Sequence, residues 1–255
     1  MPRHQRWLIK AIETVSGRGR LVSRYRQFQR ASTTASGNSV WDVALDHLGA
    51  RGPSTNQFKP PTRRPGRGLL LVANHPFGVA DGVTLAWIAS RIDPNFRVIA
   101  NGVLCQEPAL NANILPVEFQ PSRNATKRNV ETRRQAIATL RSGGVVALFP
   151  AGAVSWSPAK GVPVQEDTWK PLVGRLIKAA RPDVLPIRFS GSNSALFQHA
   201  SRTAMTFRLG LYLYEIRKRL DYPIEFTAQT PIPIEEIPDL PEQALASWLQ
   251  HHAGH

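Results

Sequence analysis

Short apolar runs alternate with helical stretches between residues 68 and 250, and this alternation constrains the fold more than any other feature. The runs are apolar on both faces, which is typical of strands in a mostly parallel sheet covered by helices. The expected strands span 68–73, 96–100, 114–119, 144–149, 184–189 and 224–229. The expected helices span 82–91, 126–142, 171–180, 203–219 and 241–250. The pattern predicts a single α/β domain with a mostly parallel or mixed sheet flanked by helices.

The N-terminal part of the chain is organised differently. Apolar side chains recur at helical spacing over 5–16 and 20–30, and Ser39 is placed to cap a third helix that stops at Gly49. The apolar faces of the first two helices either enter a membrane surface or pack on the domain itself. We expect a basic, amphipathic helical cap, a Pro-rich basic linker, the α/β domain and a polar tail, with boundaries at 1–50, 51–67, 68–250 and 251–255.

The net charge of +14 predicts an anionic partner, for which nucleic acid, anionic lipid and phosphate-bearing substrates all qualify. Half of this charge lies in residues 1–30, where eight Lys or Arg residues accompany Glu13 alone. A cationic amphipathic N-terminus indicates an anionic membrane surface as the partner. Because no zinc finger, RNA-binding aromatic pattern or basic recognition helix accompanies the charge, nucleic-acid binding is the weaker alternative.

The compartment is indicated by the cysteine count and by the length of the apolar runs. Cys105 is the single cysteine, which excludes an intrachain disulfide and suggests a reducing compartment such as the cytosol. No apolar run approaches the roughly 18–20 residues that cross a bilayer, and residues 1–17 lack the uninterrupted apolar segment of a signal peptide. We expect a cytoplasmic protein, peripheral on the inner face of the cell membrane.

The segment GLLLVANHPFGVADG carries the chemistry. His75 follows a buried strand directly, in a loop with Asn74, Pro76 and Gly78, and Asp81 is expected to cap the next helix. Reactive residues of open α/β sheets gather at the carboxyl ends of strands. Taken singly, a loop histidine and a capping aspartate are ordinary. Together they predict a catalytic pair in which a carboxylate orients a neutral imidazole as general base.

ANHPFGVADG resembles the signature of the glycerolipid acyltransferases that include 1-acylglycerol-3-phosphate acyltransferase. The usual pattern has four residues between His and Asp, whereas five separate His75 from Asp81, as in a bacterial, hemolysin-like branch of the lysophospholipid acyltransferases linked to ornithine lipids. The resemblance implies that His75 accepts the proton of an acceptor hydroxyl as it attacks an acyl thioester, while Asp81 stabilises the imidazolium. It implies no metal.

A second block, LFPAGAVSW at 148–156, resembles the Phe-Pro-Glu-Gly-Thr-Arg-Ser block of that family. The matching positions, for which the resemblance implies substrate binding, are Phe149, Pro150, Gly152 and Ser155. Backbone N–H groups near Gly152 or after His75 are the expected oxyanion donors. The carboxylate that relatives carry is absent, because Ala151 and Ala153 occupy the two candidate positions.

Weaker resemblances cover the rest of the chain. Residues 101–123 resemble the block between the two motifs, and Arg123 is the nearest substitute for its arginine. Residues 184–194 resemble the last block, and 168–180 the bacterial branch, which adds Lys170 to the expected substrate contacts. Asn74, Arg123 and Lys170 are thus the further residues expected to bind substrate. For Lys170 the alternative is a surface lysine without contact to substrate. For Arg123 the alternative is a solvated residue at the start of a helix.

The resemblance implies acyl-CoA or an acyl carrier protein thioester as co-substrate, with no bound cofactor, and a lysolipid as acceptor. Acyl carrier protein is acidic, so it also suits the basic surface. A hydrolase would need a nucleophile elbow, and the sequence has no Gly-x-Ser-x-Gly. The stronger alternative is a catalytically weak or inactive family member that binds lipid, because the carboxylate of the second block is missing.

Overall fold

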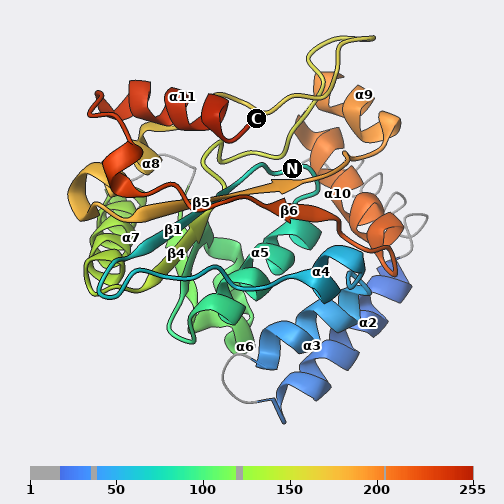
Figure 1. The fold of residues 1–255 in the computed structure, drawn as a ribbon. Coiled ribbons are helices and arrows are strands. Elements are labelled where there is room, and N and C mark those ends of the chain that lie inside the picture. Colours follow the sequence, from blue (N-terminus) through green and yellow to red (C-terminus); the bar gives the residue numbers. More distant parts are fainter. Residues whose placement is uncertain (1–17, 36–38, 119–122, 204, 255) are drawn as a thin grey trace.

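The computed structural model describes residues 18–35, 39–118, 123–203 and 205–254 (Figure 1). Its centre is a six-stranded sheet of order β3-β2-β4-β1-β5-β6. All neighbouring strands run parallel except β5 and β6, which are antiparallel. The strands are β1 (Leu69–Ala73), β2 (Arg97–Asn101), β3 (Ile114–Val117), β4 (Val145–Leu148), β5 (Asp183–Phe189) and β6 (Phe226–Ala228). The predicted single α/β domain with a mixed sheet is confirmed, and each strand lies within two residues of its predicted bounds.

Strand β1 lies in the middle of the sheet because all five of its residues are apolar. Leu69, Leu71 and Ala73 face one layer of helices, while Leu70 and Val72 face the other. Full burial of such side chains stabilises the fold by about 1.5–3 kcal/mol each for leucine and valine. The loop that follows β1 therefore begins at a fully buried strand inside the sheet.

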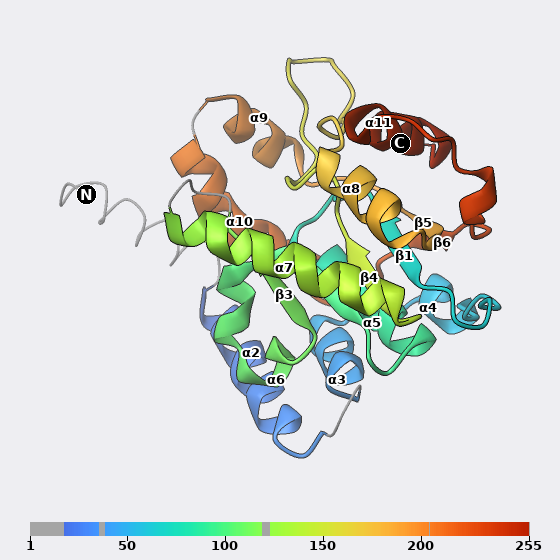
Figure 2. The same cartoon turned by 90° about the vertical axis from the view of Figure 1, so that its left-hand side faces the viewer.

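Helices cover both faces of the sheet (Figure 2). Helices α3 (Ser39–Leu48) and α5 (Val79–Ile92) lie on the face of Leu69 and Leu71 and bury Trp41, Leu45 and Leu85 there. The opposite face is covered by α7 (Arg123–Arg141), α8 (Pro171–Ala180) and α11 (Glu242–His252). This three-layer arrangement is what strands apolar on both faces require.

The remaining elements surround this body: α2 (Arg18–Ser32), α4 (Pro53–Gln57), α6 (Pro108–Asn111), α9 (Ala195–Thr203), α10 (Met205–Arg219) and the 3-10 turns η1 (Gly102–Gln106) and η2 (Ile234–Glu236). Three of these helices were not expected. Helix α4 lies inside the predicted linker 51–67, α6 precedes β3, and α9 precedes the predicted helix 203–219. Helix α11 also continues two residues into the predicted tail, to His252.

Helix α2 packs on the domain through one of its apolar residues. Phe28 is only 7% exposed and belongs to the same core as α3 and α5. Val22 and Tyr25 of the same helix are exposed. Packing on the domain is thus what the structure shows for Phe28, while the helix predicted over 5–16 lies outside the described residues. In the described ranges, none of the helices has both the length and the apolar character needed to span a membrane.

Candidate active site

His75 stands at the carboxyl end of β1, flanked by the ends of β4 and β5. Phe77 and Gly78 carry the chain from there into α5. Gly78 has φ 99° and ψ −94°, a backbone conformation that residues with a side chain rarely adopt, so glycine allows the sharp turn. The turn returns the first residues of α5 toward the imidazole.

The imidazole of His75 and the carboxylate of Asp81 form a close pair. Nδ1 of His75 lies 3.2 Å from Oδ2 of Asp81. Among the described residues Nδ1 has no partner aligned as a hydrogen bond, so the two groups are adjacent without the ideal angle. Poor alignment of this kind is common in catalytic pairs before substrate is bound. The side chain of His75 is 17% exposed and that of Asp81 is fully buried, which leaves the imidazole as the accessible member.

Asp81 does not cap α5 as the sequence analysis expected. The helix begins at Val79, its N-cap is Gly78 with no side-chain hydrogen bond, and Asp81 is the third helical residue. Its carboxylate accepts hydrogen bonds from the backbone N–H of Phe77 (2.8 Å) and of Gly82 (2.9 Å). Asp81 therefore fixes the loop and faces the imidazole at the same time.

The block after β4, residues 148–156, packs against His75. The ring of Phe149 stacks on that of His75, with centroids 3.9 Å apart and an interplanar angle of 19°. The backbone N–H of Ser155 donates to the carbonyl oxygen of His75 (2.8 Å), and Ser155 is buried. Two of the four residues singled out in 148–156 thus hold His75 directly.

The other two residues of this block organise its turn. The N–H of Gly152 donates to the carbonyl of Phe149 (3.0 Å), so this N–H is already used, which argues against the oxyanion role expected for it. The carbonyl of Pro150 accepts from the backbone N–H of Lys170 (3.0 Å) at the start of α8. The side chain of Lys170 is exposed. The structure therefore ties the backbone of Lys170 to the block and leaves its ammonium group at the surface.

Glu166 is a member of the site that the sequence analysis missed. Its Oε1 accepts from the backbone N–H of His75 (3.0 Å), and its Oε2 accepts from Nε1 of the buried Trp169 (2.8 Å). Burial raises the pKa of Glu166 to about 7, while the hydrogen bonds from Trp169 and His75 lower it. A carboxyl group that titrates near neutral pH therefore supports the histidine loop from behind. The sequence signal was slight: one acidic residue three positions before a tryptophan in a polar segment.

Asn74 lies beside His75 but is bonded to a different part of the sheet. Its Nδ2 donates to the carbonyl of Phe189 (2.9 Å), and its Oδ1 accepts from the N–H of the same residue (2.7 Å). The amide thus joins the end of β1 to the end of β5. These bonds give Asn74 a structural role, and its expected contact with substrate stays a prediction.

Arg123 is not joined to the pair of His75 and Asp81. It is the first residue of α7 and is exposed. In the part of the chain that the structure describes, none of its hydrogen bonds or ion pairs links it to His75 or Asp81. Glu118, the acidic residue of the same block, pairs instead with Arg128 (2.8 Å). A role for Arg123 in substrate binding stays a prediction.

Comparison with known proteins agrees with this site. Residues 56–190, more than half of the chain, match the family described as Acyltransferase. The chain is similar to the lyso-glycine lipid O-acyltransferase of Phocaeicola vulgatus, with 28% identity over 170 residues, which are 64% of this chain and 58% of the relative. It is also similar to the lyso-glycine lipid O-acyltransferase of Bacteroides thetaiotaomicron, with 30% identity over 136 residues, 52% of this chain and 47% of the relative.

The match to the family includes the strands and loops that build the site. Residues 56–190 contain His75, Asp81, the block 148–156 and Glu166. The chain spans about half the length of the curated relatives it matches. The match confirms the resemblance that the His-Asp segment indicated, and the chain belongs to the acyltransferase family, within the lysophospholipid acyltransferase superfamily.

Proposed function

We propose that this protein transfers a fatty acyl group from a thioester to the hydroxyl group of a lysolipid. The observation that carries the proposal is the 3.2 Å pair of His75 and Asp81 at the end of the central strand, with the imidazole as the accessible member. The two relatives are lyso-glycine lipid O-acyltransferases, and this supports a lysolipid as the acceptor class.

The reaction follows from the orientation of the imidazole. Nδ1 faces Asp81, so Nε2 is the nitrogen left to accept a proton. The acceptor hydroxyl loses its proton to Nε2 while its oxygen attacks the thioester carbonyl. The carbon–sulfur bond then breaks, the thiolate takes the proton from the imidazolium, and an ester and a free thiol result. Help from a general base of this kind contributes about 10²–10⁴ in rate.

We propose acyl-CoA or acyl carrier protein thioester as the donor, and an anionic membrane surface as the place of work, on the cytoplasmic side. The net charge of +14 supports both, since the phosphates of coenzyme A, acidic carrier proteins and anionic lipids are all attracted to it. Exposed Val22 on the basic helix α2 provides an apolar contact suited to a membrane surface. Tyr25 is exposed as well, but its hydroxyl donates to Glu107 of the domain.

The test is transfer by the purified protein, by a His75→Ala variant and by a His251→Ala control on the exposed side of α11. Each is incubated with acyl-CoA or acyl carrier protein thioester and a panel of lysolipids, and new diacyl products are measured by mass. We expect product from wild type and control, with a loss of about 10²–10⁴ in His75→Ala. Absence of product with every donor and acceptor, while the protein still binds anionic vesicles, would favour the lipid-binding alternative.

A further inference from the structure

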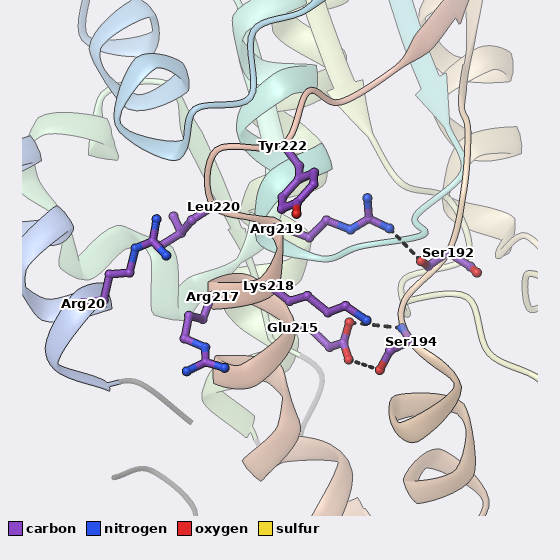
Figure 3. A pocket seen from close by; sticks show the side chains of 9 residues that line it. All are labelled: Arg20, Ser192, Ser194, Glu215, Arg217, Lys218, Arg219, Leu220 and Tyr222. Atoms are coloured by element: carbon purple, nitrogen blue, oxygen red, sulfur yellow. Dashed lines mark hydrogen bonds between the residues drawn. The ribbon is translucent and has the colours of Figure 1, made fainter. Parts of the chain in front are cut away.

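A cavity of about 650 Å³ lies between α10 and the loop that follows β5 (Figure 3). Pockets of this size hold small ligands or the headgroup end of larger ones. Neither His75 nor Asp81 lines it. The lining residues that bear on its chemistry are Arg20, Ser192, Ser194, Arg217, Lys218 and Arg219.

Cations dominate the cavity. Four of its lining residues are Lys or Arg, and one, Glu215, is acidic. The carboxylate of Glu215 is buried and already accepts from the hydroxyl and the backbone N–H of Ser194. Arg20 pairs with Asp221 at 2.6 Å, whereas Arg217 and Lys218 make no ion pair with the described residues. The cavity therefore holds cationic groups without bound counter-charges, and we expect it to attract an anion.

Arg219 joins this cavity to the catalytic loop. Its guanidinium lies over the ring of Phe77, 3.9 Å from the centroid, and its Nη2 donates to the carbonyl of Ser192 (2.8 Å). Phe77 is two residues beyond His75, and its backbone N–H donates to Asp81. The cavity thus borders the loop that carries His75 and Asp81.

Gly191 permits this close approach between the two loops. A Cβ built on Gly191 would lie 3.0 Å from Cζ of Phe77 and 3.9 Å from Nη2 of Arg219, and its φ is 102°. Any side chain here would push the 192–194 loop away from Phe77. The backbone therefore keeps the cavity and the catalytic loop adjacent.

The block after β4 cannot provide the positive charge for an anionic acceptor, because LFPAGAVSW contains no charged residue. The cations that border the catalytic loop come from α10 instead. Every residue that lines the cavity lies outside the stretch 56–190 that matches the family. The family match therefore assigns nothing to this cavity.

We propose that the cavity binds the oxyanion of the acceptor headgroup, a carboxylate or a phosphate, and holds the acceptor so that its hydroxyl reaches His75. The inference rests on the proposed function and names its acceptor class: lysolipids with an anionic headgroup. Lys218 and Arg219 extend from α10 toward the 192–194 loop, and Arg217 adds charge on the side of Arg20 (Figure 3).

The experiment compares acceptors that share one acyl chain and one hydroxyl but carry a carboxylate, a phosphate or an uncharged amide. The first variant is Arg217→Ala with Lys218→Ala, because neither side chain is in an ion pair with described residues. The second is Arg219→Gln, which keeps a donor for the carbonyl of Ser192. The control, Lys59→Ala with Arg134→Ala, removes the same charge from exposed positions outside the cavity.

We expect the double variant to lower kcat/KM for anionic acceptors by about 10-fold or more, mainly through KM, since a loss of 1.4 kcal/mol in binding is tenfold. Activity on the uncharged acceptor should stay within about twofold of wild type, as should the control on all acceptors. An equal loss on the uncharged acceptor, or no loss on the anionic ones, would overturn the proposal while the acyltransferase function stands.

Binding measurements separate this result from failure of the proposed function. Titration calorimetry with short-chain acceptors needs no turnover, so it decides the matter even if wild type yields no product. Weaker binding of anionic acceptors alone by the double variant supports the cavity. Inorganic phosphate binding as tightly as the lipids would show a free-anion site. Loss of binding to phosphatidylglycerol vesicles with unchanged acceptor preference would show a membrane contact. Either of the last two outcomes overturns the proposal.

Discussion

The two sides of Phe77 differ in how they are held. On one side, His75 and Asp81 are fixed by backbone hydrogen bonds, by stacking on Phe149 and by burial, within the stretch that matches the family. On the other side, the cavity of α10 is open, cationic and outside that stretch. Proton transfer needs groups placed to fractions of an ångström, whereas attraction of a charged headgroup tolerates flexible lysines and arginines. On the two proposals above, reaction chemistry and acceptor choice lie in separate parts of the molecule.

The largest expected effect lies on the buried side. Asp81→Asn keeps the size of the side chain but removes the charge that stabilises the imidazolium, so kcat should fall by about 10²–10³ for anionic and uncharged acceptors alike. Steady-state kinetics with both acceptors measures this. Asp239→Asn, at a highly exposed carboxylate, is the matched control and should retain activity. Full activity of Asp81→Asn would show that the carboxylate has no role in the reaction. It would also contradict the proposed separation of catalysis from acceptor binding.

A smaller effect is expected from the turn that aligns the pair. Gly78→Ala places a side chain at φ 99°, although the added Cβ would meet Val154 and Tyr212 only at ordinary contact distances of 3.5 and 3.6 Å. The strain should reduce the free energy of unfolding by about 1–3 kcal/mol and also reduce kcat. Gly66→Ala, at φ 71° with open space around it, should cost similar stability without loss of turnover. Denaturant unfolding and kinetics on both variants test this, and equal kcat in the two would contradict it.

Glu166 gives the buried side a pH dependence. Its pKa in the folded protein, about 7, lies above the ordinary glutamate value of about 4.3. Between these pH values the folded protein binds a proton that the unfolded chain has released, so the free energy of unfolding should fall as pH rises from about 4.3 to 7. Glu166→Gln cannot release a proton and avoids this decline.

We therefore expect the stability of Glu166→Gln relative to wild type to rise by up to about 3 kcal/mol over this pH range, at 1.36 kcal/mol per unit of pKa shift. Urea unfolding at a series of pH values measures the difference. Glu236→Gln, at an exposed position, is the control and should show no such trend. A pH-independent difference for Glu166→Gln would mean that its carboxyl titrates in the ordinary range.

The smallest effect concerns salt, which should weaken the binding of an anionic acceptor in the cavity but leave catalysis by His75 and Asp81 unchanged. Raising ionic strength from 0.05 to 0.5 M shortens the screening length from roughly 14 Å to 4 Å, so the KM for an anionic acceptor should rise a few-fold. The buried pair is shielded from these ions, and kcat at saturation should hold constant. Kinetics on anionic and uncharged acceptors distinguishes the two parameters. A kcat that depends on salt, with a constant KM, would contradict the assignment of acceptor binding to the exposed cavity and of catalysis to the buried pair.

The sequence was sufficient to locate the central strands because composition alone marks them. Runs such as Leu69–Ala73 and Val145–Leu148 are apolar at every position, and only burial on both faces accommodates them. The five residues of α4 include no large apolar side chain, and α9, although amphipathic, has only nine residues. Propensity and spacing are weak for such short helices, whose stability comes from tertiary packing.

The site was predictable where its residues are neighbours in the chain and not where they are distant. His75 and Asp81 are six positions apart, and their pairing follows from one turn. The bond from Glu166 to His75 spans 91 positions, and that from Asn74 to Phe189 spans 115. Such contacts depend on strand order, which composition does not fix. The capping role expected of Asp81 was wrong because the helix begins at Val79, after the positive φ of Gly78, three residues earlier than expected.

The register of the last two strands has a consequence for how such enzymes diversify. Phe189 of β5 lies opposite Phe226 of β6, so the excursion that contains α9 and α10 leaves the sheet and rejoins it at the same place. A segment with coincident ends is exchangeable: its length and content can vary while both anchor points stay still. On the proposed role of the cavity, exchange of the segment between these two phenylalanines should alter headgroup preference in a single event, and grafting residues 190–225 between homologues would test this.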